Sequence, residues 1–425
     1  MKITFVYPRF EKFLDSAAEL DIDQGLVEYY LGDFTTPPSL GIPIMKSWTP
    51  PEIETELIDD NAGDAIDYHA PTDLVAINCF TPQATRAFEI ADAFRAHGKL
   101  VVLGGIFPSF MVDECLEHAD AVNIGEVETT WERIIADARR GALERRYVGG
   151  ARFDLAQMRL PDRSIFYDKT NYDWDEDLVQ ITRGCSYNCA MCAIPAHMGC
   201  RIRRRPIDHV VDEIKTLKYE NVYLADDTLF FPQRRIADYT HELFEAIRPL
   251  GKKYFVASTP ALRTEPEFLD HAAAAGVRNF YCTMNVDPVS IKALQGGKKE
   301  RQQLIDLVKQ LEDRGIRFFG SFAIGRDWDD DGIAERILEL YVKAGIRTSE
   351  FFFFTPYPGS VHWDRLHRQG RIIDYDWRHY NGAHVVAQHP TLTEDQLYEQ
   401  FSTVWNEFFA MQKDQHAAPL EPLTY

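Results

Sequence analysis

Three cysteines lie close enough together to bind one metal centre. Cys185, Cys189 and Cys192 follow one another in the pattern C-x3-C-x2-C. Thiolates at this density are soft ligands that select zinc or an iron–sulfur cluster. A closed zinc site needs a fourth ligand, which Cys200 or His197 would have to supply. A four-iron cluster held by three thiolates instead leaves one iron open, and that iron can chelate an amino and a carboxylate group.

The composition of the 425-residue chain limits its other roles. Its formal charge is −20, and an acidic surface repels phosphate backbones, so we expect no nucleic acid partner. The seven cysteines have no regular spacing, which argues against a secreted disulfide framework. No apolar run approaches the roughly 20 residues that span a bilayer, and the first apolar run is too short for a signal peptide. These features predict a protein of the reducing cytoplasm without a membrane span.

The first 150 residues alternate short β-rich runs with helical runs such as Thr85–Ala96. This alternation predicts a doubly wound, Rossmann-like parallel sheet in domain 1–150, and such sheets bind ligands beyond the carboxyl ends of their strands. The glycines there either allow close backbone approach to a bulky ligand or only form tight turns. The predicted strands are Ile3–Tyr7, Glu54–Ile58, Leu74–Asn78, Leu100–Leu103 and Ala121–Ile124. The candidate binding residues that follow them are Asn78, Thr81, Gly104, Gly105, Phe107, Gly125 and Glu126.

Residues 151–176 have no clean period and are predicted to be a linker. Strands then alternate with helices again, which favours a partial (β/α)6 barrel over residues 177–360, with functional groups at the carboxyl ends of the strands. An amphipathic helix, about Thr393–Met411, is expected within a C-terminal helical extension, residues 361–425. The predicted barrel strands are Leu178–Thr182, Asn221–Leu224, Lys253–Ala257, Asn279–Met284, Phe318–Ile324 and Glu350–Thr355. The predicted helices between them are Ile207–Leu217, Arg234–Ile247, Glu265–Ala275, Arg301–Arg314 and Asp330–Ala344.

The cysteine pattern, placed after the first strand of a predicted βα barrel, resembles the signature of the radical SAM superfamily. The resemblance implies a [4Fe–4S] cluster on Cys185, Cys189 and Cys192, whose open iron binds S-adenosylmethionine (SAM). Met191 departs from the family, which usually has an aromatic residue before the third cysteine. The basic segment from Arg201 to Arg205 also resembles the family; it either offsets a negatively charged cluster or forms a solvated face.

The resemblance extends to the ends of the later barrel strands. Asp226-Asp227-Thr228 resembles the family's site for the methionine ammonium group, although Asp or Thr before a helix also serves as an N-cap. Thr283-Met284-Asn285 stands where relatives have a Glu-Ser pair near the ribose, which leaves the ribose contact open. The residues that the resemblance assigns to SAM are Asp226, Asp227, Thr228, Ser258, Asn285, Gly325 and Thr355.

Domain 1–150 resembles the cobalamin-binding domain of one radical SAM class. The segments Pro37–Gly41, Gly104–Pro108 and Ile124–Glu126 carry this resemblance, with Phe107 where relatives often have histidine. The Asp-x-His-x-x-Gly element of base-off cobalamin enzymes is absent. Cobalamin would then be held through its corrin edge and tail, and a domain retained only for packing is the alternative.

The combined resemblance implies a cobalamin-dependent C-methyltransferase that acts on an unactivated carbon of a small-molecule substrate. Its partners would be that substrate and an electron donor such as a flavodoxin or ferredoxin. The alternatives are a radical SAM cyclase, rearrangement or hydroxylation enzyme, some of which act on tetrapyrroles, and a zinc- or cluster-stabilised binding module. No residue can be assigned a catalytic proton or hydrogen-atom role, although Tyr281, Cys282 and Tyr357 are candidates for the barrel mouth.

Overall fold

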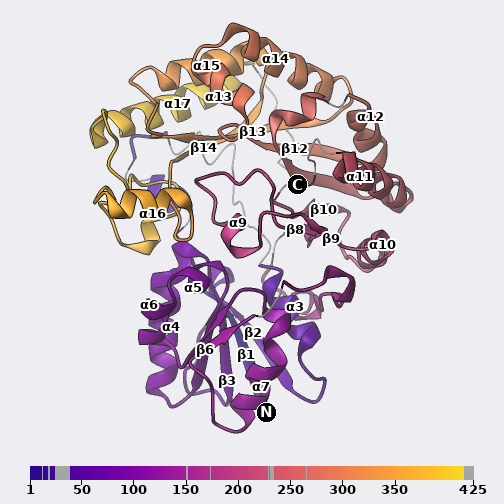
Figure 1. Cartoon of the computed structure of the whole chain (residues 1–425), viewed down its shortest axis with the longest axis vertical. Coiled ribbons are helices and arrows are strands. Elements are labelled where there is room, and N and C mark those ends of the chain that lie inside the picture. The colour runs from indigo at the N-terminus through magenta and orange to yellow at the C-terminus, as the bar shows by residue number, and fades with distance from the viewer. Residues whose placement is uncertain are drawn as a thin grey trace.

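The computed structural model describes residues 1–11, 13–17, 20–23, 39–149, 152–172, 174–227, 229, 234–264 and 266–415. Two parallel sheets of six strands each form two lobes, and the segment around β8, β9 and α9 lies at the waist between them (Figure 1). The expected combination of a doubly wound sheet, a partial barrel and a C-terminal helix is confirmed.

The N-terminal sheet has the strand order β2-β1-β3-β4-β5-β6, and all its pairings are parallel. Its central strand β3 is buried along its whole length because helices cover both faces of the sheet. The short strand β6 was not predicted, since two of its three residues are exposed and it has no apolar run. The strands are β1 (Lys2–Tyr7), β2 (Glu54–Asp59), β3 (Leu74–Asn78), β4 (Leu100–Gly104), β5 (Ala121–Ile124) and β6 (Arg146–Val148).

The helices of this lobe follow the strands. Phe88 and Phe94 of α4 pack on one face of the sheet, while Ile42 of α3 and Trp131 of α7 pack on the other. The helices are α3 (Gly41–Trp48), α4 (Ala84–Ala96), α5 (Ile106–Phe110), α6 (Val112–His118) and α7 (Trp131–Arg139), with 3-10 turns η1 (Asp60–Ala62), η2 (Thr81–Gln83) and η3 (Val127–Thr129). The short helix α1 (Phe13–Ala17) instead packs on the barrel core, where Phe13 stacks on Trp405.

The segment predicted to be a linker contains the turn η4 (Leu155–Gln157) and the short helix α8 (Ser164–Tyr167). Ile165 and Phe166 of α8 are buried in the core of the N-terminal lobe. This segment is therefore packed against the first sheet over part of its length.

The second sheet has the order β14-β13-β12-β11-β10-β7, again with parallel pairing throughout. Apolar residues on its outer face form one large core with the surrounding helices. The strands are β7 (Glu176–Val179), β10 (Asn221–Leu224), β11 (Lys253–Ser258), β12 (Val277–Thr283), β13 (Arg317–Ile324) and β14 (Thr348–Phe353). The helices are α9 (Ile194–His197), α10 (Ile207–Lys215), α11 (Arg234–Ile247), α12 (Pro266–Ala275), α13 (Pro288–Leu294), α14 (Lys298–Glu312) and α15 (Ile333–Ala344), with turns η5 (Arg248–Leu250) and η6 (Pro260–Thr264).

The predicted strand Leu178–Thr182 was wrong at both ends, since β7 begins at Glu176. The barrel strand β7 ends at Val179, and the chain then pairs as β8 (Thr182–Arg183) with β9 (Arg203–Arg204) in an antiparallel ribbon. The side chain of Asp226 accepts hydrogen bonds from the backbone N–H groups of Ile181 and Thr182, each at 2.8 Å. These two N–H groups therefore do not pair with a neighbouring strand. A distant side chain thus ends the strand, which explains why the local pattern did not predict the break.

The C-terminal segment contacts both lobes. Trp363 of α16 (Val361–Arg368) and Trp377 of η7 (Trp377–His379) are buried in the core that includes Phe107 of the N-terminal lobe. The final helix α17 (Glu394–Gln415) instead packs Phe401 and Trp405 into the barrel core. The extension therefore links the two lobes through apolar contacts.

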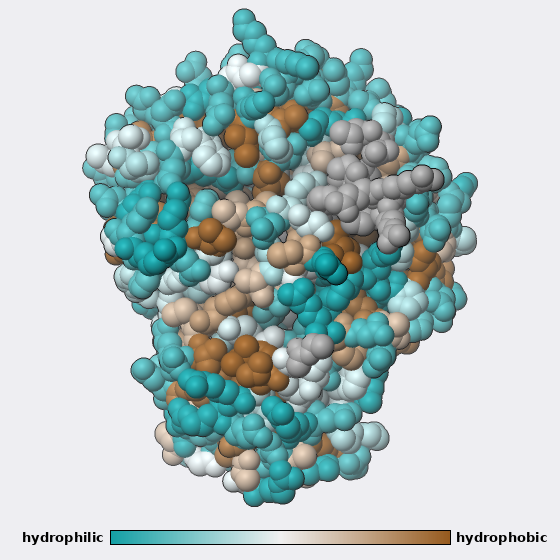
Figure 2. Space-filling model, viewed as in Figure 1, coloured by the Kyte–Doolittle hydropathy of each residue, from teal (hydrophilic) through white to brown (hydrophobic). Residues whose placement is uncertain are grey.

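The outer surfaces of both lobes are mostly hydrophilic, and apolar side chains gather on the displayed face along the waist (Figure 2). Within the described ranges, no helix has both the length and the apolar character needed to cross a membrane.

Candidate active site

Residues 184–202, which carry the three cysteines and are called the cysteine loop below, are closed at their base by the β8/β9 ribbon. Gly184 has a φ of +90°, and a Cβ atom there would lie 2.6 Å from the carbonyl oxygen of Arg201. Only glycine fits this position without displacing backbone. The N–H of Cys185 donates to the carbonyl of Gly199 at 3.1 Å, so the loop folds back on itself directly before the first cysteine.

The three predicted ligands lie together in this loop as free, half-buried thiols. Burial, together with the nearby charge of Asp227 and the neighbouring thiols, raises the pKa of Cys185 to about 11 and that of Cys192 to about 12. Deprotonation of such a group requires a strong local positive charge, which bound iron provides. The N–H of Ile194 already donates to Cys192 Sγ at 3.4 Å. The donor set therefore fits a group that binds three thiolates at once.

Neither candidate for the fourth ligand of a zinc site is arranged with the three cysteines in the described part of the chain. Cys200 is exposed, and its thiol donates to Asn188 Oδ1 at 3.7 Å. The ring of His197 lies against Phe110, and burial lowers its pKa to about 4. Among the described residues, no three His, Cys, Asp or Glu side chains are arranged to hold a single metal ion. A four-iron cluster does not need three ligands around a single metal ion, because each thiolate binds a different iron atom.

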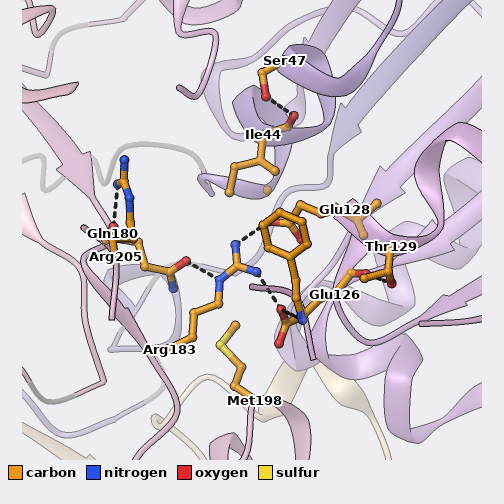
Figure 3. Close-up of polar contacts among 12 residues, drawn as sticks. Ile44, Ser47, Glu126, Glu128, Thr129, Gln180, Arg183, Met198 and Arg205 are labelled. Carbon is orange, nitrogen blue, oxygen red and sulfur yellow. Dashed lines mark hydrogen bonds and ion pairs between the residues drawn. The ribbon is translucent and has the colours of Figure 1, made fainter. Parts of the chain in front are cut away.

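A buried ion-pair network ties the cysteine loop to the N-terminal lobe (Figure 3). Arg183 donates to Glu126 Oε2 at 3.1 Å and to Glu128 Oε1 at 2.6 Å. Arg203, on the partner strand of the ribbon, donates to both oxygens of Glu126. The guanidinium groups of Arg183 and Arg203 lower the pKa of Glu126 against the effect of burial. Glu126, predicted to contact a cofactor, thus has its carboxylate engaged by two arginines.

The aspartates at the end of β10 lie in different environments. Asp226 is 3% exposed, its Oδ2 atom is enclosed without a partner among the described residues, and burial raises its pKa to about 7. Asp227 is exposed, and its carboxylate accepts a hydrogen bond from the backbone of Gly184. Asp227 is therefore the member of the pair that is open to a ligand beside the cysteine loop. The predicted Thr228 lies outside the described residues.

The remaining residues assigned to SAM lie at the carboxyl edge of the barrel sheet. Ser258, at the end of β11, is buried and its hydroxyl has no partner among the described residues. The side-chain amide of Asn285 bonds both the N–H and the carbonyl of Ala323. Gly325 has a φ of +94° and turns the chain after β13. Thr355 donates to the carbonyl of Phe353 at 3.0 Å.

Arg326 is a site candidate that was missed from the sequence. It is 4% exposed, and its Nε atom is enclosed without a partner in the described part of the chain. One Nη atom donates to the carbonyl of Asn285 at 2.8 Å, and the other lies 3.1 Å from Met191 Sδ in the cysteine loop. Burial lowers its pKa to about 10, while Asp329 and Cys189 act in the opposite direction. Its place in the chain, after a glycine at a strand end, was the only local signal.

The predicted crevice residues of the first sheet follow the adjacent strands β3, β4 and β5. The side chain of Asn78 lies against Gly105, where a Cβ atom would come within 2.7 Å of Asn78 Oδ1. Thr81 is buried, whereas Gly104 and Gly125 are partly exposed. The ring of Phe107 is 1% exposed and contacts Trp377 edge-on, with centroids 5.0 Å apart. Phe107 therefore packs in the core and does not line an open crevice.

The carboxyl edges of the two sheets come together at the waist. Phe110, at the end of α5, contacts His197 of the cysteine loop, and a Cβ atom at Gly359, after β14, would lie 2.5 Å from its ring. The N–H of His362 donates to the carbonyl of Ala190 in the cysteine loop at 2.8 Å. The cysteine loop is thus enclosed between the first sheet, the barrel and the C-terminal segment.

A parallel barrel with three clustered thiols at its carboxyl edge defines the class of the protein. Residues 179–352 match the family model described as the radical SAM superfamily, so this part of the chain is a radical SAM domain. The resemblance seen in the cysteine pattern is confirmed, and with it the expectation of a [4Fe–4S] cluster and SAM.

Curated relatives match most of the chain. It is 26% identical over 381 residues to a bacteriochlorophyllide d C-12(1)-methyltransferase of Chlorobaculum tepidum, covering 86% of this chain and 82% of that protein. It is 23% identical to a hopanoid C-2 methylase of Rhodopseudomonas palustris, covering 81% of this chain and 67% of the relative. Among solved structures, the radical SAM methyltransferase TsrM from Kitasatospora setae has a TM-score of 0.64 at 16% identity, covering 87% of this chain and 77% of TsrM. The similarity to TsrM shows that the two-lobed fold is shared.

Proposed function

We propose that this chain is a cobalamin-dependent radical SAM C-methyltransferase that acts on an unactivated carbon of a small-molecule substrate. The observation that supports the proposal most directly is the meeting of two ligand-binding sheet edges around one cysteine loop. Methyltransferases among the relatives, including proteins named for bacteriochlorophyllide and hopanoid methylation, support the same reaction.

When bound, a [4Fe–4S] cluster supplies the electron for reductive cleavage of SAM, and cobalamin supplies a methyl group. The residues of the chain position these groups. Cys185, Cys189 and Cys192 would hold the cluster, and Asp227 would face the cationic part of SAM. Arg326 places a buried guanidinium group beside the cysteine loop, with one Nη atom 3.1 Å from Met191 Sδ. The net substrate change is replacement of one hydrogen by one methyl group.

Cobalamin would lie at the carboxyl edge of the first sheet, next to Gly104 and Gly125. Open parallel sheets bind ligands beyond the carboxyl ends of their strands, and Gly104 and Gly125 lie at the ends of β4 and β5. A cofactor placed there faces the barrel mouth, which brings both donors to one carbon. The three cysteines of the cysteine loop are free thiols, which fits a protein in a reducing compartment. We propose that this protein lies in the cytoplasm.

One-electron reduction of the cluster requires a donor, and we propose a flavodoxin or a ferredoxin. Anaerobic turnover with either protein and its reductase should yield 5′-deoxyadenosine. The rate with dithionite as the reductant should be at most about tenfold higher. Failure of every flavodoxin and ferredoxin tested, with dithionite still active, would exclude this class of donor.

The mass of the product tests the reaction. Anaerobic enzyme reconstituted with iron, sulfide and cobalamin is incubated with SAM labelled at its methyl group, a reductant and candidate tetrapyrroles or polycyclic lipids. Transfer of the labelled methyl group to a substrate supports the proposal. Loss of hydrogen or gain of oxygen without label would favour the cyclisation or hydroxylation alternative. The absorption spectrum of protein purified without oxygen provides the control, since it reports the cluster and cobalamin together.

A further inference from the structure

A polar cluster lies on the inner face of the barrel, away from the cysteine loop. Ser321 and Glu350 are paired residues of β13 and β14, and Tyr281 lies on the adjacent strand β12. Tyr281 donates to Glu350 Oε1, and Ser321 Oγ donates to the same oxygen at 2.8 Å. The two hydroxyls are themselves 2.7 Å apart. The carboxylate is therefore fixed through one of its oxygens.

Strand alternation shows that this cluster faces the lumen. Phe280, Phe322 and Phe351, which neighbour the three residues along their strands, are buried in the core under the outer helices. Successive side chains of a strand point to opposite faces, so Tyr281, Ser321 and Glu350 point inward. Tyr281 and Glu350 remain partly exposed there, which indicates that the lumen is open.

The second carboxylate oxygen of Glu350 is available to a ligand. Oε2 has no hydrogen-bond partner in the described part of the chain, and it is not among the enclosed, unpartnered atoms. No arginine or lysine of that part forms an ion pair with Glu350, and burial raises its pKa. A carboxylate without a cation is costly in a low-dielectric interior, and a cationic ligand would remove that cost.

The wall beside Glu350 is aromatic. The ring centroids of Tyr223 and Phe255 are 4.9 Å apart, those of Phe255 and Tyr281 are 6.1 Å apart, and Tyr281 stacks on Phe319 at 5.4 Å. Aromatic faces carry negative electrostatic potential and attract cations as well as flat apolar groups. The lumen thus combines a flat apolar wall with an acceptor oxygen.

Glu350 is a further carboxyl group of the lumen, separate from the aspartates at its mouth. Burial raises the pKa of Tyr223, and the carboxylates of Glu176, Asp226, Glu350 and Asp227 raise it further, so all four lie near this ring. Asp226 and Asp227 end β10 beside the cysteine loop, where SAM would bind. Glu350 lies within β14, which continues to Phe353, so it is deeper in the barrel. A cation other than those of SAM is the ligand that this position favours.

We infer that the barrel lumen binds a substrate group that carries a cationic nitrogen, and that Glu350, held by Tyr281 and Ser321, is the residue that recognises it. This inference rests on the proposed function, because it assigns the lumen to the substrate of the methyl transfer. It adds a chemical class of ligand and a specificity residue to that function.

Two indole probes of opposite charge test the inference. Tryptamine and indole-3-propionate share a ring that matches the aromatic wall, and only tryptamine carries an ammonium group. Their dissociation constants are measured by anaerobic calorimetry on the reconstituted enzyme with SAM present and no reductant. Tryptamine should bind at least about tenfold more tightly, the usual contribution of one hydrogen bond to a charged group. Glu350→Gln should remove this preference, and Tyr281→Phe, which keeps the ring, should reduce it.

The control is Glu335→Gln, which removes an exposed carboxylate of α15 outside the lumen and should leave the preference intact. Equal or tighter binding of indole-3-propionate, no binding of tryptamine, or a preference that survives in Glu350→Gln would overturn the inference. Loss of SAM binding in Glu350→Gln would also overturn it, because the carboxylate would then serve SAM. Binding is measured without turnover, so failure of methyl transfer does not affect the result.

Discussion

Replacement of Glu126 by glutamine should weaken the junction between the two lobes. The side chains of Arg183, Glu126 and Glu128 are 5%, 7% and 2% exposed, and that of Arg203 is 19% exposed. Two arginines and two glutamates make this network neutral. Glu126→Gln leaves Arg183 with Glu128, but Arg203 loses its carboxylate partner and keeps two backbone carbonyls, those of Phe153 and Met198, beside the neutral amide oxygen of glutamine.

Breaking a fully buried ion pair costs roughly 3–5 kcal/mol. Arg203 is partly exposed and keeps two acceptors, so we expect a smaller loss of about 2 kcal/mol. For a lobe of this size, that loss lowers the thermal midpoint by about 4–8 °C. Because a two-lobed protein need not unfold in one step, the midpoint of the first calorimetric transition is the quantity to compare.

Asp212→Asn is the matched control, because it breaks a surface pair between Asp212 and Lys215 whose side chains are 63% and 56% exposed. That change should cost less than about 0.5 kcal/mol. The double variant Glu126→Gln with Arg203→Met should recover part of the loss, since it removes the unpaired cation. Equal shifts in Glu126→Gln and Asp212→Asn would refute the assignment of the network as a buried clamp. The iron content after reconstitution should also fall in Glu126→Gln, because Arg183 precedes the loop that carries Cys185.

Three further outcomes are expected. Gly104→Ala should leave the melting temperature and SAM cleavage near wild type, because among the described residues a Cβ atom there meets only the Asn123 side chain, with Cβ at 3.5 Å and Nδ2 at 3.9 Å. Cobalamin binding, followed by absorbance, should weaken. Burial raises the pKa of Glu176 to about 8, so the folded state favours the protonated carboxyl group, and stability falls as the pH rises from about 4.5 to 8. Glu176→Gln should therefore raise the melting temperature at pH 8 but not at pH 4.5. An equal effect at both pH values would contradict this. Alanine at any one cluster ligand should abolish the 4Fe–4S absorbance and 5′-deoxyadenosine formation, and persistent formation in such a variant would rule out the assignment of Cys185, Cys189 and Cys192.

Short-range patterns in the chain were enough to predict both sheets. The strands β3 and β10 begin and end as predicted, because runs of buried apolar residues bounded by polar ones are local features. The cysteine pattern likewise lies within one loop, so its spacing alone indicated the cluster chemistry. Strand β7 ends earlier than predicted because Asp226, from another part of the chain, captures the backbone of Ile181 and Thr182.

Contacts between distant residues were decided only by the tertiary structure. Glu126 is separated by 57 residues from Arg183 and by 77 from Arg203, and no local pattern pairs them. Glu350 meets Tyr281 because β12, β13 and β14 are neighbours in the barrel, although 69 residues separate the two in sequence. The sequence by itself determined which chemistry the cysteines can start. The tertiary structure decided what surrounds them, because burial and charge at the site depend on side chains that only the packed sheets and loops bring together.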